Sequence, residues 1–290
     1  MDRNTKTLFS YFSLILSLLF SVGLLSACRV NVSEKKENWY SYSLPQGWST
    51  KDSGKIYNEK SEYVGGFNVR TYPRKNKDGS LEFSLTKEQG EIISQEVLTE
   101  FNYLVYKLAL RQTAPDFKDD SAPSVYEHYL FPVSEHNILI DIYFDTEKTS
   151  HTQRVEVIKS VKLKLDTEKY QGYLAEIWAS ARQSRDGKLR YAIMSEDMRK
   201  EFLKTLETVD GEIVWSIGTS SPWVVDYTIE KGENSAVIYY VYTDSTGAKY
   251  TSQENITFGT EGEKQVVTSA QASDLQEVLD EVEREKTKDI

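Results

Sequence analysis

Histidine, the commonest metal ligand and general acid–base side chain, is scarce in this 290-residue chain. The only histidines are His128, His136 and His151, and there is no His-Glu-x-x-His motif, calcium loop or glycine-rich phosphate loop. We expect His128 in a strand, His136 in the following turn and His151 in a loop, so the three do not converge. The sequence therefore predicts no metal ion and no cofactor.

Two carboxylates, Asp141 and Asp145, lie on one face of a strand with clean period-two alternation. Paired carboxylates can divide the roles of general acid and general base. In the hairpin predicted for this strand and the one before it, His128 falls opposite Leu139 or Ile140. A polar face of an antiparallel strand is more commonly solvated, so we expect both aspartates to be exposed to water.

A serine nucleophile is a third possibility. Ser221 lies in a Ser-Ser-Pro-Trp segment between two predicted strands, shortly before Asp226. The sequence places no histidine or lysine beside them, and the motif Gly-x-Ser-x-Gly is absent. A bulged turn, in which serine hydroxyls bond the backbone and proline fixes φ, explains the segment more simply.

Four basic residues cluster in a chain whose net charge is −10: Arg182, Arg185, Lys188 and Arg190. Arginine presents a planar fork of donors that suits a carboxylate or another anion. The same cluster is explained by the attraction of cations to a helix C-terminus and by pairing with Asp186. Both interpretations stay open from the sequence alone.

Aromatic residues make up 12% of the chain, including 19 tyrosines. Such rings suit stacking on a ligand or glycan, although core packing explains each one singly. We expect Trp223 and Arg190 to lie together at the mouth of a pocket, an aromatic face beside a guanidinium. The candidate ligand-binding residues are Trp178, Arg190, Tyr191, Trp215, Trp223 and Asp226.

The first residues account for the position of the only cysteine, Cys28. Arg3 and Lys6 precede an uncharged run over residues 8–27, which is long enough to span a bilayer as a helix. The run ends in Leu-Ser-Ala-Cys, which resembles the lipobox of bacterial lipoproteins. The resemblance implies that the Cys28 thiol is acylated, with palmitate as one of the lipids, and that residues 1–27 are a signal peptide. An uncleaved transmembrane anchor is the alternative.

The membrane is then the expected partner, held by the lipid on Cys28 at the extracytoplasmic face of a bacterial cell membrane. Residues 28–38 are predicted to form a polar, lipidated tether. Once Cys28 is acylated no thiol remains, which excludes disulfides, thiolate metal sites and cysteine nucleophiles. The acidic composition argues against nucleic acid as a partner.

An α+β domain is predicted for residues 39–165. Its expected elements are strands over 39–44 and 62–72, a hairpin over 125–145 and a closing helix over 153–163. Residues 88–110 are predicted to form a long helix, because apolar residues recur every three or four positions. These are Ile93, Val97, Phe101, Leu104 and Leu108. The strings YSLPQGW, VGGFNVRTYP and DIYFDT…VEVIKSVKL resemble the PsbP/Mog-type α/β/α sandwich, an antiparallel sheet covered by helices, which implies an accessory or binding role.

A second domain is predicted for residues 168–270, with helices first and strands after them. The helices are interrupted at Arg185-Asp186-Gly187 and resume at Ser195, and the strands are expected over 212–218, 223–231, 235–244, 250–259 and 264–270. The strings ASARQSRDGKLRYAIMSEDMRKEF and WSIGTSSPWVVDYTI resemble the nuclear-transport-factor-2-like (cystatin-like) α+β roll of Gram-positive envelope lipoproteins. The resemblance implies a cone-shaped pocket but no particular chemistry.

Residues 271–290 are predicted to be a short helix or a disordered tail, with Ser273 and Gln276 as a capping box. Together these features favour a non-enzymatic binding module for a small molecule, an envelope component or a partner protein. One alternative, from resemblance alone, is a regulatory accessory to a membrane sensor of cell-wall stress or antibiotics. Another is an enzyme that uses the second domain's pocket, against which the absence of histidine from that domain counts.

Overall fold

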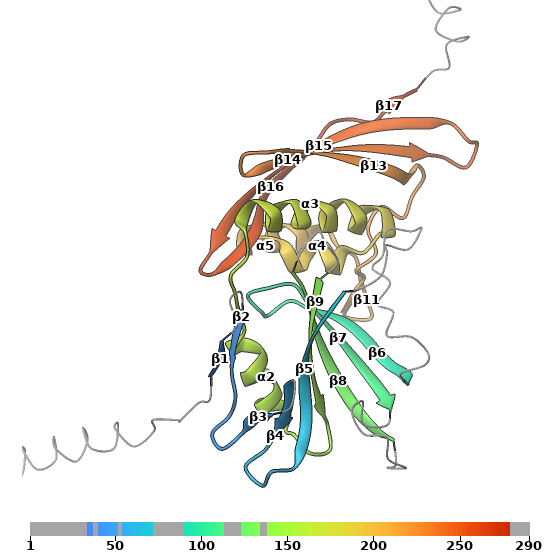
Figure 1. The fold of residues 1–290 in the computed structure, drawn as a ribbon. Coiled ribbons are helices and arrows are strands. Elements are labelled where there is room, and N and C mark those ends of the chain that lie inside the picture. Colours follow the sequence, from blue (N-terminus) through green and yellow to red (C-terminus); the bar gives the residue numbers. More distant parts are fainter. Residues whose placement is uncertain are drawn as a thin grey trace, which may run out of the picture.

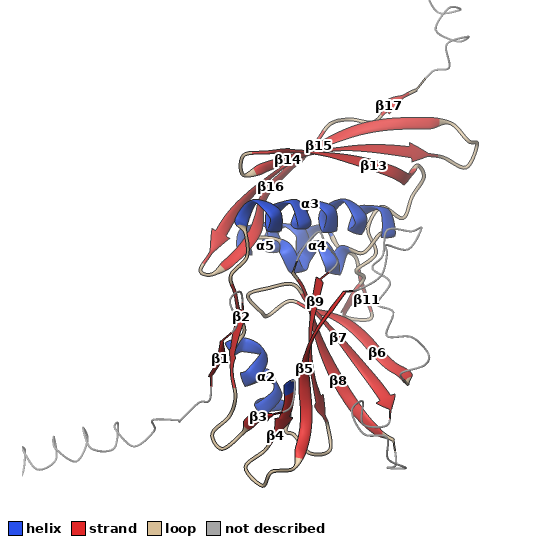
Figure 2. Cartoon of the chain, in the orientation of Figure 1, coloured by secondary structure: helices blue, strands red, loops and turns tan. Residues whose placement is uncertain are grey.

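The computed structural model describes residues 34–36, 40–51, 54–71, 90–112, 123–133 and 138–278. The predicted α+β class is confirmed, because the chain combines helices with antiparallel sheets (Figures 1 and 2). A large sheet formed by the first half of the chain and a second sheet formed by its last third lie on opposite sides of three helices (Figure 1).

The large sheet has seven strands in the order β3-β4-β5-β9-β8-β7-β6. The hairpin predicted over residues 125–145 is confirmed as β8 and β9, in which Tyr129 lies opposite Ile142. Alternation of β-branched and aromatic residues suits such a pleated surface. The strands are β3 Ser49–Lys51, β4 Lys55–Tyr57, β5 Tyr63–Thr71, β6 Glu91–Leu98, β7 Val105–Gln112, β8 Ser124–Pro132 and β9 Ile138–Asp145.

One face of this sheet packs against helix α2 (His151–Ser160) and a small sheet in the order β1-β2-β10. Its strands are β1 Glu34–Lys36, β2 Tyr40–Ser43 and β10 Lys162–Leu163. Helix α2 begins at Ser150, whose hydroxyl accepts from the backbone of Gln153 while the Gln153 side chain accepts from the backbone of Ser150. This reciprocal cap orients α2 so that Val157 and Ile158 enter the core.

The helix predicted for residues 88–110 is wrong. The described residues of this segment, 90–110, form β6 and most of β7, an antiparallel pair in which Leu98 lies opposite Val105. The apolar residues at helical spacing are divided between two strands, so that Leu108 is buried on β7 whereas Ile93 is 47% exposed on the edge strand β6. Pairing of β7 with β8, which local spacing does not encode, overrides the helical pattern.

The rest of the chain packs three helices against a sheet in the order β13-β14-β15-β16, with β17 paired to β15. Four predicted strands are confirmed as β13 to β16, whereas the strand expected over 212–218 is only the two-residue β12. The helices are α3 Thr167–Ser184, α4 Gly187–Ile193 and α5 Glu196–Thr205. The strands are β11 Thr208–Val209, β12 Glu212–Ile213, β13 Trp223–Gly232, β14 Ser235–Thr243, β15 Lys249–Glu261, β16 Lys264–Ala272 and β17 Gln276–Glu277.

Residues 273–278 do not form the predicted helix. Gln276 and Glu277 form β17, which pairs with Thr251 and Tyr250 of β15. Ser273 bonds the backbone of Gln253 with both its backbone N–H and its side chain instead of capping a helix. Residues 279–290 lie outside the described part of the chain.

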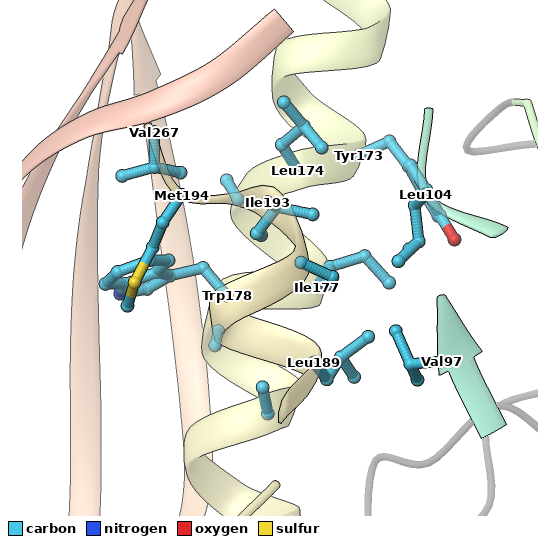
Figure 3. Packing of buried hydrophobic residues seen from close by; sticks show 14 of the residues in the cluster. Val97, Leu104, Tyr173, Leu174, Ile177, Trp178, Leu189, Ile193, Met194 and Val267 are labelled. Carbon is cyan, nitrogen blue, oxygen red and sulfur yellow. The ribbon is translucent and has the colours of Figure 1, made fainter. Parts of the chain in front are cut away.

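A single buried apolar cluster runs from the large sheet into the helices (Figure 3). Val97 of β6 and Leu104 of the β6–β7 turn lie against Ile177 of α3 and Leu189 of α4. The division into domains at residues 39–165 and 168–270 stays a prediction. What the structure adds is that residues of both predicted domains belong to one cluster.

Candidate functional site

A cavity of about 360 Å³ opens among α3, α4, α5 and the segment that follows α5. Two of the four clustered basic residues, Arg182 of α3 and Arg190 of α4, contribute to its lining. The remaining lining residues are Phe202, Thr205, Leu206, Glu207, Val214, Ser216, Ile217, Gly218 and Thr219. The cavity thus combines apolar side chains with hydroxyls and charges, and such polar groups can fix the orientation of a bound ligand.

The Arg-Asp-Gly interruption between α3 and α4 builds one wall of this cavity. Arg185 adopts a left-handed conformation (φ 62°), which ends α3, and the Asp186 carboxylate accepts from Leu189 N at 2.9 Å to begin α4. Gly187 N donates to Trp215 O at 2.7 Å, and Ile217 N donates to Arg185 O at 3.1 Å. These backbone bonds fix the segment that carries Ser216 and Ile217 against the helices.

The Gly187 position requires glycine. A Cβ added there would lie 2.5 Å from Trp215 O, and a backbone atom cannot move aside as the end of a side chain can. The glycine of the Arg-Asp-Gly sequence therefore has a local structural explanation. The backbone at Gly187 lies very close to the backbone at Trp215.

Arg190 is buried, and its donors are used within the protein. Its Nη1 and Nη2 donate to Glu254 Oε1 and Oε2 at 3.3 and 2.8 Å, and Nη2 also donates to Tyr240 Oη at 3.0 Å. Its Nε donates to Trp178 O at 3.1 Å, and the guanidinium lies 4.3 Å from the Trp178 ring centroid. Four of the five N–H donors of Arg190 are therefore used by Glu254, Tyr240 and Trp178.

This network perturbs its members in opposite directions. Burial would raise the pKa of Glu254, but the charge and hydrogen bonds of Arg190 and the Tyr240 hydroxyl outweigh burial and lower it. Burial raises the pKa of Tyr240, and the positive charges of Arg190 and Arg182 oppose part of that rise. Glu254 is consequently the anion that balances Arg190.

Arg182 is in a different situation, although it lies close enough to lower the pKa of Tyr240 by its charge. It is half-buried, and it forms no ion pair or side-chain hydrogen bond with any other residue that the structure describes. Glu254 already balances Arg190. Arg182 thus brings an uncompensated positive charge to the cavity wall.

The six predicted ligand-binding residues lie in separate places. Trp178 and Arg190 meet in the buried network, so Trp178 is a core residue with 1% of its surface exposed. Tyr191 contacts Trp215 edge-on with ring centroids 5.2 Å apart, and Arg199 lies over the Tyr191 ring. These contacts are internal packing.

Trp223 and Arg190, predicted to lie together, contact different partners. Trp223 is half-buried beneath Arg185, whose guanidinium lies 5.9 Å from its ring. Asp226 is exposed and lines a separate groove of about 450 Å³ along β13 to β15, together with Tyr239. The predicted set therefore does not form one site.

Most of the cavity-lining residues that the sequence did not predict belong to the segment after α5. Ser216 and Ile217 fall where a strand was expected, and Glu207 and Thr219 fall in connecting segments. Their roles depend on the backbone bonds to Gly187 and Arg185, which join residues far apart in sequence. The only sequence signal for them is the glycine at the α3–α4 break.

The polar face of β9 is buried, which corrects the expectation that Asp141 and Asp145 are solvated. Both aspartates are 0% exposed. His128 lies opposite Tyr143 rather than Leu139 or Ile140, and its Nδ1 is 2.9 Å from Asp141 Oδ1. On β9, Tyr143 belongs to a buried cluster of tyrosines, and Leu139 belongs to the apolar cluster that includes the helices.

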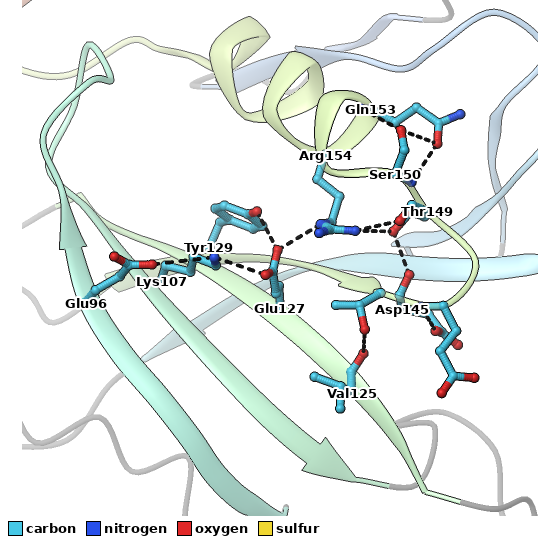
Figure 4. Close-up of polar contacts among 12 residues, drawn as sticks. Glu96, Lys107, Val125, Glu127, Tyr129, Asp145, Thr149, Ser150, Gln153 and Arg154 are labelled. Carbon is cyan, nitrogen blue, oxygen red and sulfur yellow. Dashed lines mark hydrogen bonds and ion pairs between the residues drawn. The ribbon is translucent and has the colours of Figure 1, made fainter.

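The opposite face of the large sheet carries a second polar cluster, centred on Glu127 (Figure 4). Glu127 accepts from Tyr129 Oη and Arg154 Nε, each at 2.8 Å, and pairs with Lys107 at 3.0 Å. Burial would raise the pKa of Glu127, but these partners outweigh it and lower the pKa. Arg154 also donates to Thr149 O at 2.6 Å. Because Arg154 belongs to α2 and Glu127 to β8, the bond between them joins the helix to the strand.

Across the described residues, no group of three or more histidine, cysteine, aspartate or glutamate side chains is arranged to hold a metal ion. None of the helices described is both long and apolar enough to cross a membrane. Comparison with protein-family models and with curated proteins gives no match for this chain.

Proposed function

We propose that this chain is a lipid-anchored protein on the extracytoplasmic face of a bacterial cell membrane, and that it binds a small ligand through an anionic group of that ligand, without transforming it. The observation that carries the binding role is Arg182, a half-buried guanidinium with no anionic partner among the described residues, on the wall of a 360 Å³ cavity. Arginine is the side chain best suited to a carboxylate or phosphate.

The charges around the cavity support an anion there. Arg190 and Glu254 neutralise each other inside the protein. The chain as a whole carries a net charge of −10, so an arginine without an anionic partner, such as Arg182, stands out from its surroundings. An anion in the cavity meets one local positive charge, whereas elsewhere the acidic surface repels it.

The anchoring role is supported by the uncharged run over residues 8–27 and the Leu-Ser-Ala-Cys sequence that ends at Cys28. The two finer fold assignments, PsbP-like for residues 39–165 and nuclear-transport-factor-2-like for residues 168–270, are part of the same proposal. Both resemblances favour binding or accessory roles. All three histidines of the sequence precede α3, which speaks against acid–base catalysis at the cavity.

The test uses the full chain in a mild detergent, titrated by calorimetry with benzoate and phosphate, and with neutral benzamide as the uncharged probe. We expect at least one anion to bind and benzamide not to bind. Arg182→Gln should weaken anion binding by about tenfold or more, because hydrogen bonds to charged groups are the strong ones.

Arg111→Gln is the control variant, since Arg111 is an exposed arginine of β7 that pairs with Glu91 away from the cavity. It should bind the anion as the unmodified protein does. Anion binding that survives Arg182→Gln would contradict the proposed function. So would the absence, at millimolar concentration, of binding both by these anions and by the carboxylate-bearing zwitterions described below.

A further inference from the structure

The cavity contains a second charge without a partner, and its sign is opposite to that of Arg182. Glu207, which follows α5, lines the same cavity and is exposed. Its side chain forms no ion pair or hydrogen bond within the described part of the chain, and only its backbone carbonyl is engaged, by Val214 N at 2.9 Å. Arg182 and Glu207 therefore share one cavity without pairing with each other.

Resting on the proposed function, we infer that the ligand is a small zwitterion, a free amino acid or short peptide with an apolar side chain. Its carboxylate is bound by Arg182 and its ammonium group by Glu207. A ligand that carried only negative charge would leave Glu207 unsatisfied and repelled. A zwitterion places a complementary charge against each residue at once.

The apolar part of such a ligand has a surface to contact. The same cavity is also lined by four apolar residues, Phe202, Leu206, Val214 and Ile217. Thr205 donates its hydroxyl to Phe202 O at 2.7 Å, which leaves its oxygen able to accept a further hydrogen bond, as from a ligand ammonium. The cavity combines groups for both ends and for the body of the ligand.

The size of the cavity agrees with this ligand class. Its volume of about 360 Å³ lies near the lower end of the range for ligand pockets, about 300–1,000 Å³. An amino acid or dipeptide fits such a volume, whereas an oligosaccharide or long peptide does not.

The two charged residues are also held on a fixed framework. Arg182 belongs to the last turn of α3, and Glu207 is anchored by its backbone bond to Val214. The segment that carries Ser216 and Ile217 is fixed by two backbone hydrogen bonds. Gly187 N donates to Trp215 O, and Ile217 N donates to Arg185 O. A backbone that is fixed before binding does not have to be ordered when a ligand arrives, which lowers the entropic cost of binding.

The experiment titrates the full chain with L-leucine, L-phenylalanine and leucyl-alanine. N-acetyl-L-leucine keeps the carboxylate but lacks the charged amine, and L-leucinamide keeps the amine but lacks the carboxylate. We expect at least one zwitterion to bind, and each of the two blocked compounds to bind at least about tenfold more weakly than leucine.

Two variants assign the ends of the ligand. Arg182→Gln should remove binding of zwitterions and of N-acetyl-L-leucine. Glu207→Gln should weaken zwitterions to the level of N-acetyl-L-leucine and leave N-acetyl-L-leucine itself unchanged or improved. Glu201→Gln, at an exposed glutamate of α5 that pairs with Lys204, is the matched control and should change neither.

The outcomes separate this inference from the proposed function. If N-acetyl-L-leucine or benzoate binds as tightly as every zwitterion, or if Glu207→Gln has no effect, the ligand class is wrong while the anion-binding function stands. If neither the zwitterions nor the simple anions bind, both proposals are wrong.

Discussion

Arg190 of α4 donates to both carboxylate oxygens of Glu254 of β15, at 3.3 Å from Nη1 and 2.8 Å from Nη2, in the interior of the molecule. The two residues are 5% and 6% exposed. A buried ion pair of this kind contributes little over an apolar pair of the same volume, but a single remaining charge is costly.

Replacing one partner alone should therefore destabilise the protein strongly. For Arg190→Met we expect a loss of about 3–5 kcal/mol in the free energy of unfolding, because Glu254 is left buried without its counter-charge. The double variant Arg190→Met/Glu254→Met should recover most of that loss. Urea unfolding followed by circular dichroism measures all three proteins, and a single variant as stable as the unmodified chain would show that the pair is not buried.

The same pair predicts a pH dependence. The folded-state pKa of Glu254 is lowered from its ordinary value of 4.5. The stabilisation is therefore complete above the unfolded-state pKa of about 4.5 and is lost as the pH falls through the lower folded-state pKa. Unfolding free energies measured from neutral to acidic pH should fall less steeply in Glu254→Gln than in the unmodified chain. Equal slopes would contradict the lowered pKa.

Gly187→Ala should damage the cavity wall. Its Cβ would lie 2.5 Å from Trp215 O, and we expect the resulting overpacking to cost about 1–3 kcal/mol. Gly172→Ala in α3 is the matched control, since its Cβ would meet the flexible end of the Lys231 side chain at 2.4 Å rather than backbone. Thermal unfolding with and without benzoate should show a lower melting temperature and weaker binding for Gly187→Ala alone. Similar behaviour of the two variants would mean that the wall is not constrained by backbone contact.

Cys28→Ser should prevent lipidation and processing, because the thiol is the acyl acceptor that the Leu-Ser-Ala-Cys sequence predicts. Cells grown with labelled palmitate should incorporate label into the unmodified protein and not into the variant, and the mass of the unmodified protein should show loss of residues 1–27. Label retained in Cys28→Ser would exclude the lipoprotein proposal.

The local sequence pattern was sufficient to predict elements in which buried residues recur at a regular spacing. The alternation over β9 predicted the correct element, and the helix expected to resume at Ser195 is α5, which Ser195 caps. The helix prediction for residues 88–110 was wrong because a pair of strands can also carry apolar residues at helical spacing. What distinguishes the two is the partner strand β8, which follows β7 only after an intervening loop.

The candidate site was less predictable because its contacts are long-range. The sequence left an anion site open as one of two interpretations of the cluster that contains Arg182 and Arg190. It gave no means to see that Glu254, 64 positions from Arg190, neutralises one of them. The contact of His128 with Asp141 was missed for a related reason, since the register of β8 against β9 decides which residues face each other.

The apolar cluster that continues from the large sheet into α3 and α4 also limits how this architecture can be inherited. A gene cut between residues 165 and 168 would yield one product with Leu104 and Val97 facing water and another with Ile177 and Leu189 facing water. Each half would tend to aggregate or to associate with the other half through its exposed apolar face. Recombination would therefore pass the two halves on as one module, and relatives that share only one of them should carry polar substitutions on that face.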